Sequence, residues 1–431
     1  MAAAQTVNHA LGSQFVAASA AAPRRAGSVW LTRVIVFTPV VFATLLAKFT
    51  LPGLNIPSIG MLFPMVIIAV AAGLATGRLQ PVPMRLALFL LMLSVLALIQ
   101  IWRGEVFSLP SLAMMAVLGF AYVPAARRGT VTQEDALRFF CNLTALIALA
   151  GVIQFTLQFV GGKAFAFPIE TFVPDWLRTR GYNDIAPLYY GAKIYKATGF
   201  VMLEPSVFCQ LCALGLTAEL VHRNRGWRMA AYAAGIVVSY SGTGLLILAV
   251  TLPVLVILYQ RWDLLLRGLL LLAVLALLVE PLNLNVTLNR ASEFSSSGGS
   301  SAFIRFVGWM NLFADKLWTD PARALFGYGA GTFFSAAEVY RAGEMAHAKI
   351  FFEFGVVGGL LYFVFLFYCF LSSRAPLALR IGVLAAYFMN GAYSPSVTGI
   401  ATSLLLWPAL PVATQSRARQ LPGEPEVADA K

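Results

Sequence analysis

The chain has 431 residues, of which 59% are hydrophobic and only 12% are charged. Soluble globular domains carry about 25% charged residues, so this composition excludes that class. The net charge of +12 would suit a nucleic-acid-binding protein. However, the basic residues lie between apolar segments rather than on a soluble basic face, and no nucleic-acid partner is expected. The composition predicts an all-α polytopic membrane protein.

About twelve apolar segments are candidates for membrane helices, because crossing the hydrocarbon core takes roughly 20 residues. They lie near 31–50, 58–76, 83–101, 109–125, 136–160, 199–221, 228–241, 243–260, 265–284, 348–372, 378–394 and 398–414. The seventh and eighth share a run that is too long for one helix, and we predict a break at Ser241-Gly242. We therefore expect about 12 transmembrane helices in a membrane domain at 29–414. The tails at 1–28 and 415–431 are expected to be disordered and cytoplasmic.

Basic residues predict the orientation, because Lys and Arg concentrate in short cytoplasmic loops. Counted from a cytoplasmic N-terminus, every inner connection carries at least two arginines. The short outer connections hold only Lys48 and Arg103. The remaining basic residues lie in two long segments, 161–198 and 285–347. The pattern places both termini inside and both long segments outside, where we expect short amphipathic helices.

The first outer segment mixes basic and aromatic side chains. They are Trp176, Arg178, Arg180, Tyr182, Tyr189, Tyr190, Lys193, Tyr195 and Lys196. Basic groups suit phosphate oxygens, and flat aromatic faces suit sugar rings. The same mixture is typical of any loop at a membrane interface. The composition alone leaves both interpretations open.

Glu204 and Pro205 are predicted to lie about one turn inside the sixth apolar segment. A carboxylate there is costly, and a proline would free a carbonyl in the preceding turn. A kinked helix whose carboxylate reaches back to the interface would explain the pair. We favour the alternative, in which the carboxylate faces a cavity.

The second outer segment combines three kinds of sequence. Its start, around Arg290, is rich in Ser and Gly and is typical of flexible chain. Apolar residues then recur with a helical period over 303–318, which predicts an amphipathic helix on the membrane surface with Arg305 on its first turn. Three glycines follow in the stretch GYGAG. We predict a structural turn there, because the lysine of a P-loop is missing.

The stretch AHAKIFFEFG opens the tenth apolar segment with three ionisable residues. Lys349 and Glu353 are four residues apart, so we expect them to pair and to set the depth of the helix in the membrane. His347 is expected one residue before the helix, at the membrane surface. A lone histidine is usually a bystander, but this one is the only histidine predicted on the outer side, which makes it a functional candidate.

Motifs for metal and nucleotide chemistry are missing from the sequence. It has no D-x-D, no H-E-x-x-H and no P-loop, so metal-dependent nucleotide-sugar transfer, zinc hydrolysis and NTP use lose support. Cys209 and Cys212 form a C-x-x-C, but both fall inside an apolar segment and are expected to serve helix packing. We expect no metal and no cofactor.

Taken together, these features resemble the bacterial O-antigen polymerase and O-antigen ligase superfamily. The resemblance rests on the twelve segments, the two long outer loops, and the motifs TGFVMLEPSVF, SYSGTGLLILAV, LFGYGAGTF and FGVVGG. By motif it covers roughly residues 195 to 372. The Glu-Pro-Ser of residues 204–206 is closer to the exopolysaccharide-polymerase branch. Many relatives have asparagine after the histidine, whereas this chain has Ala348.

The resemblance implies a glycosyltransferase of the bacterial inner membrane. Such an enzyme transfers an oligosaccharide from undecaprenyl diphosphate to an acceptor glycan at the periplasmic face, without a metal, and we expect inversion at the anomeric carbon. The implied catalytic candidates are His347, Arg305 and Glu204, with His347 or Glu204 as the base. The candidate substrate-binding residues are Arg178, Arg180, Tyr189, Tyr190, Lys193, Lys196 and Arg290. Inner-membrane lipids and chain-length regulator and flippase proteins are the other expected partners.

Two other functions remain open from the sequence. A ligase would move a finished glycan to lipid A core or another acceptor with the same site. A flippase or transporter would move lipid-linked sugars without making glycosidic bonds. We favour the polymerase, because the Glu-Pro-Ser stretch matches that branch and buried charges at mid-membrane are scarce.

Overall fold

The computed structural model describes residues 27–50, 61–103, 107–127, 130–189, 191–280, 283–285, 301–391 and 394–408. Residues 1–26 of the predicted N-terminal tail, the predicted tail 415–431, Tyr190, Arg290 and most of the Ser/Gly-rich start of the second outer segment lie outside these residues. The last two residues of the predicted N-terminal tail are helical, because α2 begins at Gly27. Within the described residues the chain is mostly helical, and its one sheet pairs two short antiparallel strands, β1 (Leu79–Pro81) and β2 (Pro124–Ala126).

Every apolar segment predicted from the sequence overlaps a helix. Those in the first half are α2 (Gly27–Thr44), α3 (Leu62–Ala75), α4 (Pro83–Arg103), α5 (Leu109–Phe120), α6 (Gln133–Ala166), α7 (Pro168–Phe172) and the short η1 (Asp175–Leu177). Next come α8 (Pro205–His222), α9 (Gly226–Ser239), α10 (Thr243–Leu258) and α11 (Asp263–Leu277). The last part holds α13 (Ser301–Phe306), α14 (Gly308–Leu312), η3 (Phe313–Leu317), α15 (Pro321–Phe326), α16 (Phe333–Tyr340), α17 (Ala346–Leu371), α18 (Leu377–Met389), α19 (Pro395–Ile400) and η4 (Ala401–Leu406).

Among the described residues, three stretches are long and apolar enough to cross a membrane: Pro83–Arg103, Gln133–Phe172 and Ala346–Leu371. Six shorter apolar helices of 10 to 17 residues lie in the same described part of the chain. The predicted break between the seventh and eighth segments is confirmed, because α9 ends at Ser239 and Tyr240 takes a left-handed conformation with φ 45°. The structure is therefore an all-α membrane protein in character.

Local sequence explains where several helices begin. The Thr132 hydroxyl accepts a hydrogen bond from Asp135 N, and the Asp135 carboxylate accepts one from Thr132 N, so a capping box starts α6. Ser108 caps α5 by a single bond, because its hydroxyl accepts from Ser111 N. Proline at the first position starts α8, where its missing N–H costs no helical hydrogen bond.

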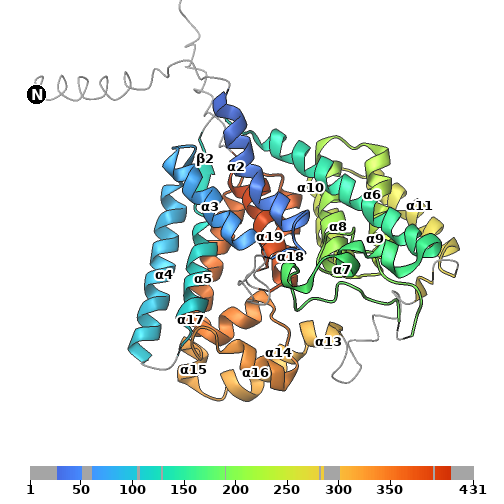
Figure 1. Cartoon of the computed structure of the whole chain (residues 1–431). Helices are drawn as coiled ribbons and strands as arrows, with labels where there is room; N and C mark the ends of the chain where they lie inside the picture. The colour runs from blue at the N-terminus through green and yellow to red at the C-terminus, as the bar shows by residue number, and fades with distance from the viewer. Residues whose placement is uncertain are drawn as a thin grey trace, which may run out of the picture.

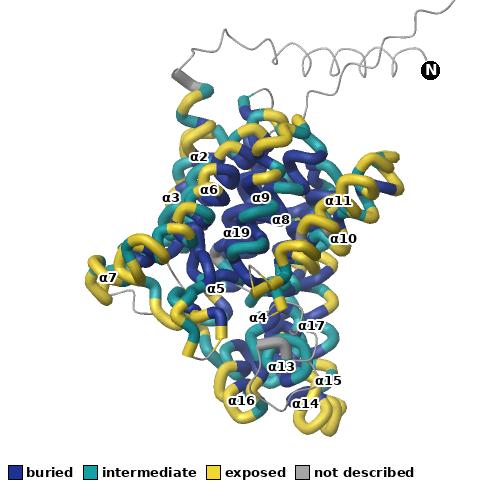
Figure 2. Tube along the Cα trace, turned by 90° about the vertical axis from the view of Figure 1, so that its right-hand side faces the viewer, coloured by how far each residue is buried: buried dark blue, intermediate teal, exposed yellow. Residues whose placement is uncertain are grey.

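Helix α8 lies in the centre of the helical body and packs against α6, α9, α10 and α18. It is buried on nearly all sides, as expected for a helix that is apolar around its whole circumference. Figure 2 shows the buried residues gathered in the middle of the body, with exposed residues on peripheral elements such as α7 and α11. The described residues of α11 are exposed along nearly its whole length.

The connections between helices gather at two ends of this body. At one end β1 pairs with β2, and Arg33 at the start of α2 pairs with Asp135 at the start of α6. At the other end Phe49 bridges to Arg178, and Met345 bridges to Gly391. Figure 1 shows α2 beginning at the first end, with α13 to α16 at the opposite one.

The predicted amphipathic helix over 303–318 is helical but divided. Val307, with φ −114°, separates α13 from α14, and η3 continues the segment as one π-helical turn. The Ile304 carbonyl accepts a hydrogen bond from Gly343 N at 2.7 Å, which ties α13 to the chain that leads into α17. The single predicted helix is thus a row of short pieces held by contacts outside it.

Helix α17 is interrupted at Gly355, which has φ 66° and ψ −169°. The glycine turn predicted at 327–331 packs against this interruption, and its three glycines all have positive φ. Tyr328 N donates to the carbonyl of Phe352 and Gly329 N to that of Glu353, both at 2.9 Å. The turn is therefore structural, as predicted, and it anchors the second outer segment to α17.

We expect Gly327→Ala to lower the unfolding midpoint of the detergent-purified protein by several degrees. Its φ of 76° and ψ of −170° suit only glycine, and an added Cβ would lie 2.4 Å from the Glu353 backbone. Gly77→Ala is the matched control, because Gly77 also has a positive φ but nothing within 4 Å of the added atom. An equal loss in both variants would show that packing against α17 adds nothing to the backbone strain.

Candidate functional site

Two of the three predicted catalytic residues meet at the start of α8, although they are 101 residues apart. Arg305 Nη2 lies 3.4 Å from Glu204 Oε2 and 3.4 Å from Ser206 Oγ. The Ser206 hydroxyl donates to Glu204 Oε2 at 2.9 Å, and Asn183 N donates to Glu204 Oε1 at 3.4 Å. We call these four residues, from the first outer segment, α8 and α13, the Glu204–Arg305 cluster.

The position predicted for Glu204 was wrong by about one turn. Glu204 does not lie inside the helix, but is the residue just before α8, with an extended backbone at φ −145° and ψ 156°. The residue before a proline disfavours helical geometry, and Pro205 therefore fixes the start of α8. The proline causes no kink there, and the carboxylate lies at the positive end of the helix dipole, where a negative charge is favoured.

His347 lies on the first turn of α17 rather than before it, which corrects its predicted position by one residue at the helix start. The imidazole is partly buried between aromatic rings. Its ring centre lies 4.8 Å from that of Trp309, at an interplanar angle of 86°, and 6.0 Å from that of Phe388. Nδ1 is buried and has no hydrogen-bond partner among the described residues.

His347 is linked to the Glu204–Arg305 cluster by two routes. The first runs through α13 and α14, because Trp309 follows Arg305 by four residues and contacts the imidazole. The second runs through the end of α18: Ala346 N donates to the Asn390 carbonyl at 3.0 Å, and Asn390 Nδ2 donates to Gln210 Oε1 at 2.6 Å. The starts of α8 and α17 and the end of α18 therefore form one connected region.

Lys349 and Glu353 form the predicted ion pair, with Nζ 3.3 Å from Oε1. The side chains are 1% and 0% exposed, so the pair lies in the protein interior. Phe333 N donates to Glu353 Oε1 at 3.4 Å, and the Lys349 ammonium lies 3.9 Å from the centre of the Phe334 ring. The pair joins the first turns of α17 to the start of α16.

Glu344 is a third ionisable group near the start of α17. Burial raises the pKa of this carboxyl, Glu353 acts in the same direction, and Lys349 opposes them. At neutral pH a larger share of Glu344 is therefore protonated than of an exposed glutamate. It precedes His347 by three residues, and the sequence interpretation did not select it.

The described basic and aromatic candidates of the first outer segment differ in their surroundings. Arg178 pairs with Asp175 and lies 3.8 Å from Asp184, so its charge is met within its own loop. Arg180, Tyr189 and Lys193 are exposed, whereas Lys196 is buried.

The sequence analysis missed a buried ion pair between Lys48 and Glu170. The Lys48 ammonium also donates to the Thr198 hydroxyl at 3.2 Å, and Gln154 accepts from Thr198 N at 2.7 Å. One signal was present: Lys48 is one of only two basic residues in the short connections that we predicted to be outside. Ser206, Trp309 and Gln210 were also missed, because each acts through a neighbour that is distant in the sequence.

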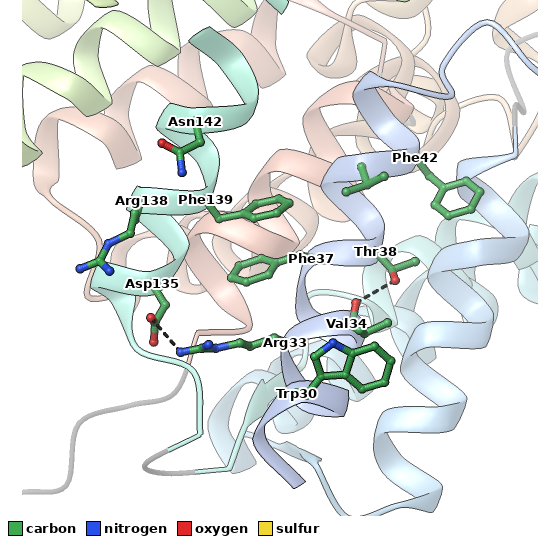
Figure 3. A pocket seen from close by; sticks show the side chains of 11 residues that line it. Trp30, Arg33, Val34, Phe37, Thr38, Phe42, Asp135, Arg138, Phe139 and Asn142 are labelled. Carbon is green, nitrogen blue, oxygen red and sulfur yellow. Dashed lines mark hydrogen bonds and ion pairs between the residues drawn. The ribbon is translucent and has the colours of Figure 1, made fainter. Parts of the chain in front are cut away.

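A groove with a volume of about 530 Å³ lies elsewhere, between α2 and α6 (Figure 3). Phe37 and Phe139 stack within it at 4.3 Å, and Arg33 pairs with Asp135 at 3.2 Å. Its second arginine, Arg138, pairs with Glu134. None of the predicted catalytic residues lines this groove, and both of its cations are already paired.

Comparison with known proteins found no match: no family model, no curated protein and no solved structure matches the chain.

We expect Glu353→Gln to destabilise the purified protein by about 3 kcal/mol, because it leaves the Lys349 charge buried without its carboxylate. Glu134→Gln is the control. It removes an exposed i,i+4 pair with Arg138 and should change stability by less than about 0.5 kcal/mol. Chemical denaturation measures both, and equal stabilities of the two variants would contradict the structural role of the Lys349–Glu353 pair.

Proposed function

We propose that this protein is a glycosyltransferase of the bacterial inner membrane that polymerises undecaprenyl-diphosphate-linked oligosaccharide repeats onto an acceptor glycan. One observation carries the proposal: Arg305 meets Glu204 and Ser206 at the start of α8, and the same outer segment contacts His347 through Trp309. A cation for the leaving group and a candidate base for the acceptor thus belong to one connected region. The superfamily resemblance predicts the same two residue types.

The chemistry follows from the residue types. The acceptor hydroxyl oxygen attacks the anomeric carbon, the bond from that carbon to the diphosphate oxygen breaks, and undecaprenyl diphosphate leaves with the electron pair. A guanidinium binds phosphate oxygens in bidentate fashion, so Arg305 offsets the growing charge without a metal. The His347 imidazole takes the hydroxyl proton. Attack opposite the leaving group inverts the anomeric carbon.

The distribution of the connections supports a periplasmic site. The region that holds His347 and Arg305 belongs to the end of the body opposite the start of α2. The connections near the start of α2 carry the arginines expected on the cytoplasmic side. We therefore place about 12 crossings in the membrane, both termini in the cytoplasm, and the donor lipid, acceptor glycan and partner flippase and chain-length regulator at the outer face.

Purified protein incubated with lipid-linked repeats tests this proposal directly. A polymerase makes a ladder of longer glycans on the lipid, which a gel resolves. A ligase leaves repeat length unchanged and moves glycan to a separate acceptor. A transporter makes no new glycosidic bond in either assay, and that result would overturn the proposal.

His347→Ala should lower the rate of polymer formation about a hundredfold, which a positioned base contributes. His222→Ala is the control, because His222 ends α8 and belongs to neither proposed role. The assay compares membranes with matched protein levels and includes Glu344→Gln. If His347→Ala retains the wild-type rate while Glu344→Gln loses it, the base is the Glu344 carboxyl.

Arg305→Lys should lower polymer formation at least tenfold even though the charge is kept, because an ammonium cannot copy the fork of a guanidinium. Arg323→Lys is the matched control. Arg323 lies in the same outer segment, is 24% exposed against 23% for Arg305, and lies 3.8 Å from Asp320. If the two lysine variants retain equal activity, Arg305 acts only as a general attraction for anions.

A further inference from the structure

The Glu204 carboxylate occupies the donors that a phosphate group would use. Its Oε2 atom accepts from the Ser206 hydroxyl and lies 3.4 Å from Arg305 Nη2, while Oε1 accepts from Asn183 N. Guanidinium, hydroxyl and backbone N–H are also the usual donors to phosphate oxygens. A diphosphate and this carboxylate would therefore compete for the same groups.

We propose that Glu204 is an internal anion that holds the diphosphate site of the unloaded protein and is displaced from Arg305 when the donor binds. The inference rests on the proposed function and assigns Glu204 a role other than base. It is a positioning residue that keeps Arg305 and Ser206 in place in the unloaded protein. When a ligand with two phosphate groups binds, the phosphate oxygens replace the carboxylate as the acceptors for Arg305 and Ser206.

The exposure of the pair fits such an exchange. The side chains of Arg305 and Glu204 are 23% and 22% exposed. The Lys349–Glu353 pair, by contrast, is 1% and 0% exposed and has no route to an incoming ligand without local opening. A partly exposed pair has a small net free energy in water, so a diphosphate can replace the carboxylate at low cost.

Displacement also changes contacts beyond the cation. Asn183 belongs to the first outer segment, so releasing Glu204 from Arg305 frees one link between that segment, α8 and α13. The donor's diphosphate then takes over the contacts with Arg305 on α13 and with the Ser206 hydroxyl. Donor binding is thereby coupled to the first outer segment, which carries the candidate sugar-binding aromatic residues.

Calorimetric titration of detergent-purified full-length protein with inorganic pyrophosphate tests the exchange. Glu204→Gln keeps the size of the side chain but removes the competing charge, so it should bind pyrophosphate about fivefold tighter than the wild type. The gain should vanish when Arg305→Ala is combined with it. Glu338→Gln, an exposed acid of α16, controls for the general effect of one fewer negative charge.

Equal or weaker binding by Glu204→Gln would overturn the inference, as would a gain that persists without Arg305 or that Glu338→Gln reproduces. Glu204→Ala serves as the second variant if the glutamine variant does not fold, and the same criteria apply to it. The polymer assay is run on the same samples. A wild type that makes no glycosidic bond refutes the proposed function, while the pyrophosphate result still decides the exchange of anions.

Discussion

The N–H groups of Tyr328 and Gly329 bond to the carbonyls that the interruption at Gly355 leaves without partners in α17. A regular helix would pair those carbonyls four residues further on, and a helix in hydrocarbon must have its backbone polar groups satisfied by protein. The second outer segment is therefore held on α17 by main-chain bonds. Together with the bond from Gly343 N to the Ile304 carbonyl, this attachment holds the segment that carries Arg305 and Trp309.

The attachment brings together groups that no single helix could supply. Arg305 comes from α13, Glu204 and Ser206 from the start of α8, and the imidazole of His347 from the start of α17. Each lies at or near a helix end, where backbone and side chains can face solvent while the rest of the helix is buried. The arrangement places polar chemistry at one end of an apolar body without placing unpaired charges in its middle.

The sequence predicted the elements of the fold better than their contacts. Apolar runs located the helices, and the i,i+4 spacing predicted the Lys349–Glu353 pair. The burial of that pair was not predictable, because it depends on α16, whose Phe333 and Phe334 contact the pair. The predicted position of Glu204 was wrong because the apolar residues continue upstream of Pro205 to residue 199. Backbone sterics before the proline nevertheless fix the start of α8 at Pro205.

The candidate site was predicted in its residue types but not in its partners. Arg305 and His347 were selected by sequence, whereas Ser206 and Trp309 were not. Serine and tryptophan are common in membrane helices and at membrane interfaces, so their presence alone does not indicate a functional site. The Lys48–Glu170 pair was missed for a related reason: its members are 122 residues apart. Ion pairs across such separations are set by helix packing, which one sequence does not specify.

The division of the segment over 301–317 into short helices has a consequence for how the site works. Arg305 and Trp309 are four residues apart, on either side of the break at Val307, yet one contacts the start of α8 and the other the start of α17. A displacement of this segment changes both contacts at once. We therefore expect binding of an anion at Arg305 to affect the packing of the His347 imidazole, so that the two groups proposed as leaving-group cation and acceptor base respond together.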